Sequence, residues 1–394
     1  MQKDPIVIVA AKRTPIGNFQ GSLKTMSSPQ LGSVAIQAAL AAAQLKPNVI
    51  HEVLMGCVLP AGLGQAPARQ ASIGAGIPVS VGCSTVNKMC GSGMKTVMMA
   101  YDSIMAGSHN VVIAGGMESM TNAPYLLPHA RAGYRMGHYQ VIDHMFYDSL
   151  EDAYDKGRLM GTFAEDCAQQ YHFTREDQDK FALNSIEKSC HAIKTGSFVD
   201  EIAPVTVITK QGTQIIDTDE GPTTVKPEKI PTLRPAFRQN GTVTAANSSS
   251  ISDGAAALIL MRQSDAELQG IKPLATIVGH SQHAQAPNLF TTAPIGAIDK
   301  LLTHINWKVT DVDLFEINEA FAVVPMAVIK ELQLSPEKVN VNGGACVLGH
   351  PIGASGARII VTLLYALQKQ GLKRGVAALC IGGGEATAVA IERM

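Results

Sequence analysis

The sequence predicts an α/β protein made of two similar halves, with a further domain inserted between them. Short runs rich in β-branched residues alternate with alanine-rich stretches of helical character along most of the chain. The second half repeats the order of loop, helix, buried strand and glycine turn that the first half shows. The chain has 394 residues, more than one ordinary domain, so two or three packed units are expected.

In the first half, expected strands alternate with expected helices, and this alternation predicts a mostly parallel sheet covered on both faces. Apolar, β-branched runs are expected to form strands at residues 6–10, 53–58 and 111–114. Helices are expected at residues 31–45, just before Pro47, and at residues 92–106. The last of these strands runs directly into a glycine pair.

Residues 119–248 differ in composition, because aromatic, charged, proline and glycine residues become frequent there. One amphipathic helix is expected at Thr174–Lys194, where Thr174 and Asp177 can form a capping box. Strand and helix alternation resumes at about residue 253. The expected units are a first half of residues 1–118 plus 249–272, an inserted domain of residues 119–248, and a second half of residues 273–394.

An internal duplication is expected from two matching stretches. The segment V-N-K-M-C-G-S-G-M-K-T-V is followed by a helix and then V-V-I-A-G-G-M-E-S. The segment V-N-G-G-A-C-V-L-G-H-P-I-G-A-S-G-A-R-I-I is followed by a helix and then A-A-L-C-I-G-G-G-E-A-T. Equivalent loops of the two halves would then meet at a shared site, although coincidental repetition of common α/β units stays an alternative here.

The composition argues against nucleic-acid and membrane partners. There are 32 basic and 33 acidic residues, a net charge of −1, so no overall basic field exists. The first apolar run is too short for a signal peptide, and none approaches the roughly 20 residues of a membrane span. Charged residues make up only 16% of the chain, which favours a homo-oligomer. A soluble, cytoplasmic protein is expected.

The seven cysteines favour reduced thiols over disulfides or metal ligands. Their number is odd and they show no C-x-x-C spacing. Cys90, in M-C-G-S-G-M-K, precedes the expected helix at 92–106, whose N-terminus should stabilise a thiolate and lower the pKa below about 8.5. A nucleophile is therefore favoured at Cys90 over a buried structural cysteine.

Three more polar residues lie where apolar runs end. His350, in L-G-H-P-I-G-A-S-G, can take a proton from a thiol, although a lone loop histidine is more often structural. Cys380, in L-C-I-G-G-G, would count as structural if it stood alone. Asn318 follows a strand-like run, where it can cap a helix or hold a water or a carbonyl group.

Five motifs, in this order, resemble the thiolase family: M-C-G-S-G-M-K, A-G-G-M-E-S-M, N-E-A-F, N-G-G-A-C-V-L-G-H-P-I-G-A-S-G-A-R and C-I-G-G-G. They extend over nearly the whole chain, and short-chain members are the most similar. The resemblance implies duplicated α/β halves in a layered α-β-α-β-α core with an inserted loop domain. It also implies an acyltransferase of lipid and fatty-acid metabolism that reversibly joins two acetyl-CoA molecules into acetoacetyl-CoA and CoA.

The resemblance implies a role for each candidate residue. Cys90 would carry the acyl group, and His350 would take its proton and help to bind the thioester oxygen. Cys380 would remove a proton from the α-carbon of the second acetyl-CoA. Asn318 would hold a water in one oxyanion hole, and the backbone N–H groups of Cys90 and Gly382 would form the other.

The resemblance also implies contacts with CoA, the substrate carrier, and no metal or other cofactor. Ser249 and Ala245 would contact the pantetheine arm. The expected walls near the thioester are Leu150, Met160, Ala320 and Phe321. The resemblance implies a homotetramer or a homodimer. Residues 126–137 would form the loop that holds the tetramer together.

Some residues depart from the family pattern. Leu159 replaces a frequent histidine, and Phe290 replaces a pocket methionine. A frequent arginine is missing near residue 222, so Lys226 or Lys229 would supply charge for the CoA phosphates. The last turn is G-G-G-E-A-T. These departures leave the acyl-chain length open.

Three alternatives follow. A thiolase of fatty-acid β-oxidation would use the same catalytic residues with longer 3-ketoacyl-CoA substrates. A non-catalytic acyl-CoA or lipid carrier on the same fold would not need Cys90, His350 and Cys380 together. A ketosynthase-like enzyme would be expected to have a second histidine in place of Cys380.

Overall fold

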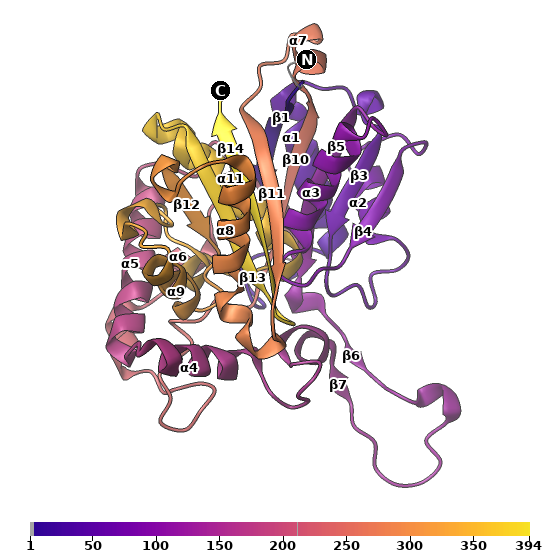
Figure 1. The fold of residues 1–394 in the computed structure, drawn as a ribbon. Coiled ribbons are helices and arrows are strands. Elements are labelled where there is room, and N and C mark those ends of the chain that lie inside the picture. Colours follow the sequence, from indigo (N-terminus) through magenta and orange to yellow (C-terminus); the bar gives the residue numbers. More distant parts are fainter. Residues whose placement is uncertain (1–3, 211) are drawn as a thin grey trace.

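A mixed ten-stranded sheet lies at the centre of the computed structural model, which describes residues 4–210 and 212–394 (Figure 1). Within these residues the strands follow the order β12-β13-β14-β11-β1-β10-β5-β3-β4, and β2 pairs with β10. Their bounds are β1 Ile6–Arg13, β2 Gly17–Asn18, β3 Glu52–Gly56, β4 Gly82–Val86, β5 Val111–Ser119, β10 Ser252–Arg262, β11 Ala275–Ala284, β12 Leu314–Ile317, β13 Arg374–Ile381 and β14 Glu385–Arg393.

The two halves have the same strand order. In the first half it is β1-β10-β5-β3, and in the second it is β11-β14-β13-β12. Corresponding neighbours also run in the same relative directions, with two antiparallel pairs followed by one parallel pair. The halves join through β1 and β11, which pair only at Val7–Thr276 and Ile8–Ala275. This arrangement confirms the predicted duplication.

Helices form three layers around the sheet. Those of the body are α1 Ser28–Ala43, α2 Pro67–Gly74, α3 Ser92–Met105, α7 Gln263–Leu268, α8 Ala293–Ile305, α9 Val323–Glu331, α10 Ala345–Leu348 and α11 Ile352–Gln370. Helices α3 and α11 pack together and against strands of both halves, whereas α1 and α2 cover the other face of the first half and α8 and α9 that of the second. The predicted α-β-α-β-α layering is confirmed.

Alternation along the strands explains this layering. In β10, Leu258 and Leu260 pack toward α3 and α11, and Ile259 packs toward α1. Successive strand side chains point to opposite faces, so a run that is apolar throughout can only be buried on both sides. The strands of such a sheet therefore need helices on each face.

The prediction of a mostly parallel sheet was wrong. Only the pairs β3–β4, β3–β5 and β12–β13 are parallel among the described residues, and the remaining sheet pairs are antiparallel. The difference arises because β10 enters the first-half sheet from a distant part of the chain, and because a tight glycine turn joins β13 to β14. Parallel neighbouring strands need a crossover connection, which is usually a helix. Neither the long connection to β10 nor the turn between β13 and β14 is of that kind.

The predicted elements are present with shifted ends. Helix α1 begins three residues earlier than expected, where Ser27 and Gln30 form a capping box, and it ends at Ala43. Strand β3 covers Glu52–Gly56, and β5 continues five residues past the predicted end to Ser119. Helix α3 spans Ser92–Met105, close to the predicted range.

The segment between β5 and β10 lies outside the central sheet. It contains the two-stranded hairpins β6 Tyr125–Leu126 with β7 Ile142–Asp143 and β8 Val205–Thr209 with β9 Gly212–Ile216, and helices α4 Met160–Tyr171, α5 Arg175–Lys194 and α6 Glu220–Thr224. Figure 1 shows the β6–β7 hairpin projecting from the body. The capping box of Thr174 and Asp177 at the start of α5 is confirmed. The domain boundaries stay a prediction.

Shorter helical turns connect these elements. They are η1 Pro47–Val49, η2 Met120–Asn122, η3 Ala130–Ala132, η4 Phe146–Leu150, η5 Pro227–Thr232, η6 Pro287–Thr292, η7 Val309–Asp311 and η8 Pro336–Lys338. None of the helices in the described parts of the chain combines the length and the apolar character that a bilayer crossing requires.

Candidate active site

Cys90 lies in a tight turn between β4 and α3. Met89, just before it, has a φ of +47°, a left-handed conformation that is uncommon for a residue other than glycine. The Ser92 hydroxyl donates to the Met89 carbonyl at 2.6 Å and accepts from the Lys88 N–H at 2.8 Å. These bonds hold the turn, so the partly buried Cys90 side chain leaves the backbone at a fixed place beside the start of α3.

Cys380 lies one residue before the end of β13 and is fully buried. Burial raises the pKa of Cys380, and a thiolate at Cys90 would raise it further, so the two thiols lie within electrostatic reach of each other. The backbone N–H groups of Cys90 and Gly382 both interact with the Cys90 sulfur. The glycine turns of the two halves therefore meet at one place, as the duplication predicts.

An ion pair joins the same two turns. The ammonium group of Lys88 binds the carboxylate of Glu385, the first residue of β14. Lys88 is two residues before Cys90, and Glu385 belongs to the unusual G-G-G-E-A-T turn. Glu385, which departs from the pattern of the resembled family, therefore links the turn that carries Cys380 to the turn that carries Cys90.

The prediction of a lowered pKa for Cys90 was wrong. Burial raises the pKa of the Cys90 thiol, and the hydrogen bonds from the backbone N–H groups of Gly382 and Cys90 oppose that rise only in part. The pKa of Cys380 is raised well above its usual value, chiefly by burial. Both groups are therefore neutral thiols at neutral pH until a base or a substrate changes their surroundings.

His350 has one ring nitrogen occupied and one free. Its Nδ1 lies 2.5 Å from the hydroxyl of Ser355, and that hydroxyl donates its only proton to the Pro351 carbonyl at 2.9 Å. Ser355 must then accept from His350 Nδ1–H, which leaves Nε2 as the unprotonated nitrogen. Nε2 is buried and has no hydrogen-bond partner among the described residues. Burial, with the nearby charge of Arg358, lowers the pKa of His350 to about 3.

Asn318 follows β12 and is held at both its backbone and its amide oxygen. Its N–H donates to the Ala378 carbonyl at 3.0 Å, and its Oδ1 accepts from Nη2 of Arg358 at 3.3 Å. Its Nδ2 is buried without a partner among the described residues. Helix α9 begins only at Val323, so Asn318 is not a helix cap. Of the two possibilities from the sequence, a group that binds an oxygen is the one that fits.

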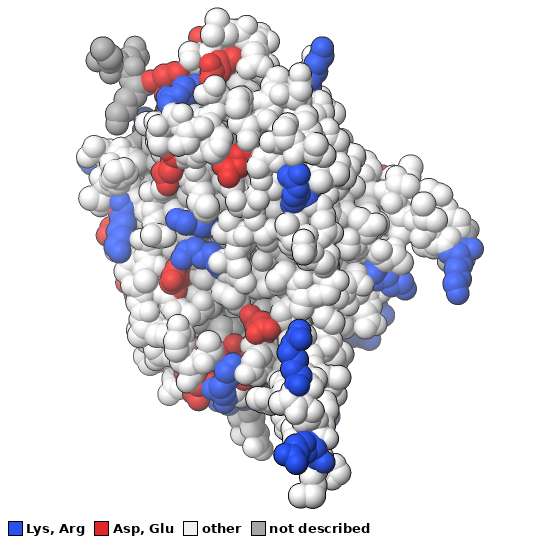
Figure 2. Space-filling model, turned by 90° about the vertical axis from the view of Figure 1, so that its right-hand side faces the viewer, with Lys and Arg blue, Asp and Glu red and all other residues white. Residues whose placement is uncertain are grey.

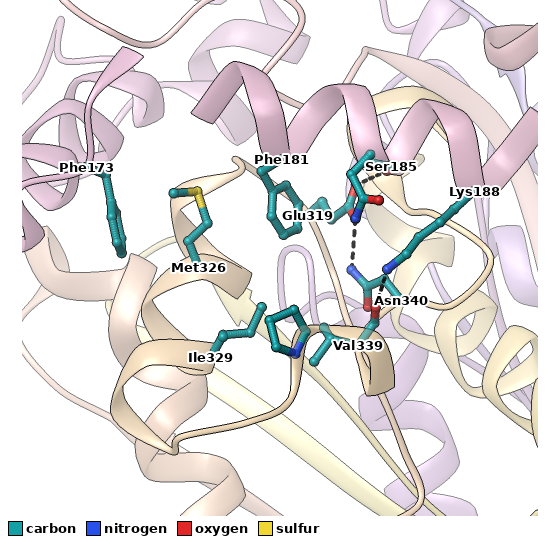
Figure 3. Close-up of a pocket in the computed structure, with 11 residues that line it drawn as sticks. Phe173, Phe181, Ser185, Lys188, Glu319, Met326, Ile329, Val339 and Asn340 are labelled. Carbon is teal, nitrogen blue, oxygen red and sulfur yellow. Dashed lines mark hydrogen bonds between the residues drawn. The ribbon is translucent and has the colours of Figure 1, made fainter. Parts of the chain in front are cut away.

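Glu319, the residue after Asn318, is held by three hydrogen bonds. Its carboxylate accepts from Ser185 Oγ at 2.8 Å, from Asn340 Nδ2 at 2.9 Å and from the Cys346 N–H at 3.1 Å. Figure 3 shows this cluster at the edge of a cavity of about 260 Å³. The wall away from Glu319 is mostly apolar and comes from α5, α9 and η8, with neither thiol in the lining.

Glu118 joins the two halves next to the site. Its carboxylate accepts from the backbone N–H groups of Val58 at 2.9 Å, Leu59 at 3.2 Å and Gly353 at 2.9 Å. Burial raises the pKa of Glu118 to about 7 despite these bonds. It thereby ties the start of α11, three residues after His350, to the loop that follows β3.

Sequence reasoning missed Glu118, Ser355 and Arg358. Each stands inside a motif that was recognised, A-G-G-M-E-S-M or G-H-P-I-G-A-S-G-A-R. For Glu118 and Arg358, a charged residue within an otherwise apolar or glycine-rich run was the available signal, because such a group is buried only when it is paired. Ser355 gave no comparable signal.

Two of the predicted substrate contacts, Met160 and Leu150, lie near the turns that carry the thiols. A cavity of about 260 Å³ is lined by Met89, Met160, Gly382 and Gly383, and its rim includes residues of η4. Leu150, the last residue of η4, packs against the same apolar cluster as Cys90. The cavity thus opens beside the meeting point of the two glycine turns.

The predicted wall residues Ala320 and Phe321 follow the Asn318–Glu319 pair. The Ser249 N–H donates to the Ala320 carbonyl at 2.9 Å, so the Ser249 segment runs beside them. Phe290 is 3% exposed, and its ring lies 6.5 Å from that of Phe321 and 6.1 Å from that of Phe163. The phenylalanine that departs from the family pattern is therefore part of an aromatic core.

Two other predicted CoA contacts, one with the pantetheine arm and one with the phosphates, do not line this cavity. Ala245 lines a different cavity of about 420 Å³, together with Phe19 and Val347. Lys229 is exposed on η5, and its described hydrogen bonds are made by its backbone, with Lys226 and Thr232. Lys226 is exposed on the same segment.

Comparison with known proteins agrees with this geometry. Residues 6–264 match the family model "Thiolase, N-terminal domain", and residues 271–393 match "Thiolase, C-terminal domain". Acetyl-CoA acetyltransferase 2 of Arabidopsis thaliana is 52% identical over 391 residues, which are 98% of this chain and 96% of that protein.

Two solved structures are similar over nearly the whole chain. The acetyl-CoA acetyltransferase of Bacillus anthracis superposes with a TM-score of 0.97 at 41% identity, covering 99% of each chain. The Acat5 thiolase of Ascaris suum, solved in complex with coenzyme A, has a TM-score of 0.94 at 42% identity, covering 99% of this chain and 100% of that one. Both thiolase domain models match, and together they span nearly the whole chain. The two thiols and the imidazole lie in the glycine-rich turns of the recognised motifs. The chain therefore belongs to the thiolase family.

Proposed function

We propose that this protein is an acetyl-CoA C-acetyltransferase, which reversibly converts two acetyl-CoA molecules into acetoacetyl-CoA and CoA. The observation that carries the proposal is the meeting of Cys90 and Cys380, one from each half, within electrostatic reach of each other. A nucleophile and a carbon-directed base must both reach the same small acyl group, and this arrangement allows it. Relatives named acetyl-CoA acetyltransferase support the choice of substrate.

In the first half-reaction, the Cys90 sulfur attacks the thioester carbonyl of acetyl-CoA. The Cys90 proton passes by way of His350 Nε2 to the departing CoA sulfur, and the C–S bond to CoA breaks as the new C–S bond forms. Because the free thiol has a raised pKa and the imidazole a lowered one, this transfer is unfavourable before substrate binds. The unfavourable proton transfer is offset when an oxyanion develops on the carbonyl, because hydrogen-bond donors fixed in a site that excludes water stabilise that oxyanion strongly.

In the second half-reaction, the Cys380 thiol gives its proton to His350 Nε2, and the Cys380 thiolate then removes a proton from the α-carbon of a second acetyl-CoA. The oxygen of the resulting enolate accepts from Nε2–H of His350 and from a water held by the free Nδ2 of Asn318. The enolate carbon then attacks the acetyl group on Cys90, while the N–H groups of Cys90 and Gly382 bind the oxyanion. Collapse releases acetoacetyl-CoA and the Cys90 thiolate, which takes the proton back from His350 Nε2. CoA thioesters are the substrates, and the proposed steps need no metal or other cofactor.

Replacing Ser355 by alanine is expected to lower kcat while KM stays near its wild-type value. The change removes the acceptor of His350 Nδ1–H, leaves that donor unpaired, and frees the ring to adopt the other tautomer. A cost of about 1–3 kcal/mol corresponds to about a 5–150-fold loss. Steady-state thiolysis of acetoacetyl-CoA, with thermal unfolding alongside, measures it.

Thr362→Ala is the matched control for this variant. Thr362 is a buried hydroxyl on the same helix, and it donates to Glu201 at 3.1 Å rather than to His350. If both variants lowered kcat equally, the role assigned to Ser355 would be wrong, and both would simply be packing defects.

A preference for short acyl chains separates the proposed activity from a thiolase of fatty-acid β-oxidation. We expect kcat/KM for acetoacetyl-CoA to exceed that for 3-ketooctanoyl-CoA by about 10-fold or more, since each surplus methylene costs about 1–3 kcal/mol in a pocket that does not fit it. The test is thiolysis of both substrates at equal CoA concentration. A preference for the longer substrate would assign the protein to β-oxidation instead.

We also propose a homotetramer, with a dimer as the smaller unit. Strand β4 is an edge strand of the sheet, and much of it is exposed; an uncovered edge is a template for pairing with another chain. On the β6–β7 hairpin Leu127 and Val141 are more than half exposed, and Met136 is 92% exposed. Figure 2 shows that charged side chains are sparse on this side of the molecule.

Finally, we propose a cytoplasmic location and a role in fatty-acid and lipid metabolism. All seven cysteines are free thiols, which suits a reducing compartment. The acyl-CoA chemistry is the basis for the metabolic assignment, and concentrations of acetyl-CoA and CoA would set the net direction.

A further inference from the structure

Arg358 on α11 is buried between two residues at the end of β12. Its Nη1 donates to Glu316 Oε1 at 3.1 Å and its Nη2 donates to Asn318 Oδ1 at 3.3 Å. Glu316 lies in β12 and Asn318 is the first residue after it, and because one guanidinium group contacts both, their side chains lie on the same side. The guanidinium group thus spans the two side chains and is only 2% exposed.

The chemistry of the guanidinium group decides which way the Asn318 amide faces. Arginine has donors and no acceptor, so the amide atom that meets it must be the oxygen. The NH₂ group is then turned to the other side, where Nδ2 is buried and has no partner among the described residues. Such a donor is destabilising when nothing accepts from it, so the site favours an incoming oxygen atom.

The same helix also fixes the histidine. Ser355, three residues before Arg358, holds His350 Nδ1 at 2.5 Å, and three residues along a helix share one face. One polar face of α11 therefore orients two groups that each carry a buried polar atom without a partner among the described residues, Nδ2 of Asn318 and Nε2 of His350. A helix that carries two such contacts sets their relative placement more rigidly than separate loops would.

We propose that Arg358 is a positioning residue, which acts through Asn318 by holding its amide with the NH₂ group toward the enolate oxygen. The inference deepens the proposed function and rests on it. Arg358 itself does not touch the substrate in this scheme. Its effect on turnover is therefore expected to vanish when Asn318 is absent.

The primary test is Arg358→Lys, alone and combined with Asn318→Ala. Lysine keeps the charge but cannot span Glu316 and Asn318 with two fixed donors. We expect kcat for acetoacetyl-CoA formation to fall by about 100-fold, the cost of a misplaced group, with KM within about 3-fold of wild type. In the Asn318→Ala background the same change should lower kcat by less than about 2-fold, because non-additivity reports that the two residues act as a unit.

Arg13→Lys is the matched control. Arg13 is also fully buried and paired with two carboxylates, Glu201 and Asp219, but it makes no hydrogen bond to Asn318. If Arg13→Lys lowers kcat as much as Arg358→Lys does, the effect is general destabilisation and the proposal is wrong. Equal losses in the wild-type and Asn318→Ala backgrounds would overturn it as well.

Asn318→Asp provides a second variant in case Arg358→Lys fails to fold. The carboxylate keeps the size of the amide and can still accept from Arg358, but it offers no donor. We expect kcat to fall by about 10²–10³-fold, as for the loss of an oxyanion donor, with unchanged thermal unfolding. Retained activity in this variant would contradict the assigned amide orientation.

The failure of this inference can be told apart from the failure of the proposed function. If wild-type protein mixed with acetyl-CoA forms no acetyl adduct on Cys90 by intact-mass analysis, the proposed function fails. If the adduct forms but the Arg358→Lys effect is the same with and without Asn318, only the role of Arg358 is overturned.

Discussion

Cys90→Ser is expected to abolish the acetyl-enzyme and to lower kcat by about 10⁴-fold or more, as for loss of a catalytic nucleophile. Serine keeps the shape of the side chain, but its hydroxyl ionises far less readily than a thiol. In wild-type protein, acetyl-CoA should add the mass of one acetyl group, located on the peptide that contains Cys90. Intact-mass and peptide analysis after brief mixing measures both points.

Cys83→Ser is the control for this experiment. Cys83 lies in β4, seven residues before Cys90. The one hydrogen bond described for its side chain goes to the Val81 carbonyl. This variant should be acetylated and turn over as the wild type does. Acetylation that persists in Cys90→Ser would mean that another residue carries the acyl group, and unchanged behaviour of Cys90→Ser would favour the carrier alternative.

Cys380→Ser should separate the two half-reactions. We expect it to form acetyl-Cys90 as the wild type does, yet to lower condensation by about 10²–10⁴-fold, the usual contribution of a positioned base. Burial raises the pKa of Cys380 well above its usual value, so its thiolate, once formed, is a strong base for an α-proton. A serine hydroxyl in the same place cannot take that role.

Exchange in D₂O is the sharpest measurement for this variant. Wild-type protein should exchange the methyl protons of acetyl-CoA for deuterium, and Cys380→Ser should not, while mass analysis still finds the acetyl adduct. Cys167→Ala is the control, since Cys167 is also buried and its charge bears on Cys380. Undiminished exchange in Cys380→Ser would assign the base to another residue, and a loss of acetylation would assign Cys380 to the first half-reaction.

The positions of the reactive groups were predictable because they follow from local pattern. Cys90, His350 and Cys380 each stand where an apolar run meets a glycine turn, and the matching stretches around residues 90 and 350 revealed the duplication. The capping box of Thr174 and Asp177 was equally local, since its two residues are three apart. Such features need no knowledge of which strands become neighbours.

The partners of these groups were not predictable, because they come from distant parts of the chain. Glu118 binds the N–H of Gly353, 235 residues away, and Arg358 reaches Asn318 across 40 residues. The prediction of parallel strands failed for the same reason. Strand β10 lies between β1 and β5, and the chain reaches that place only after the inserted segment. The pKa of Cys90 depended on burial, which the helix dipole argument did not include.

The equal strand order of the two halves bears on how the chemistry is divided between them. The proposed acyl carrier, Cys90, lies in the first half, and His350 and Cys380 lie in the second. A half expressed by itself would hold one thiol without its counterpart, so neither half alone could complete both proposed half-reactions.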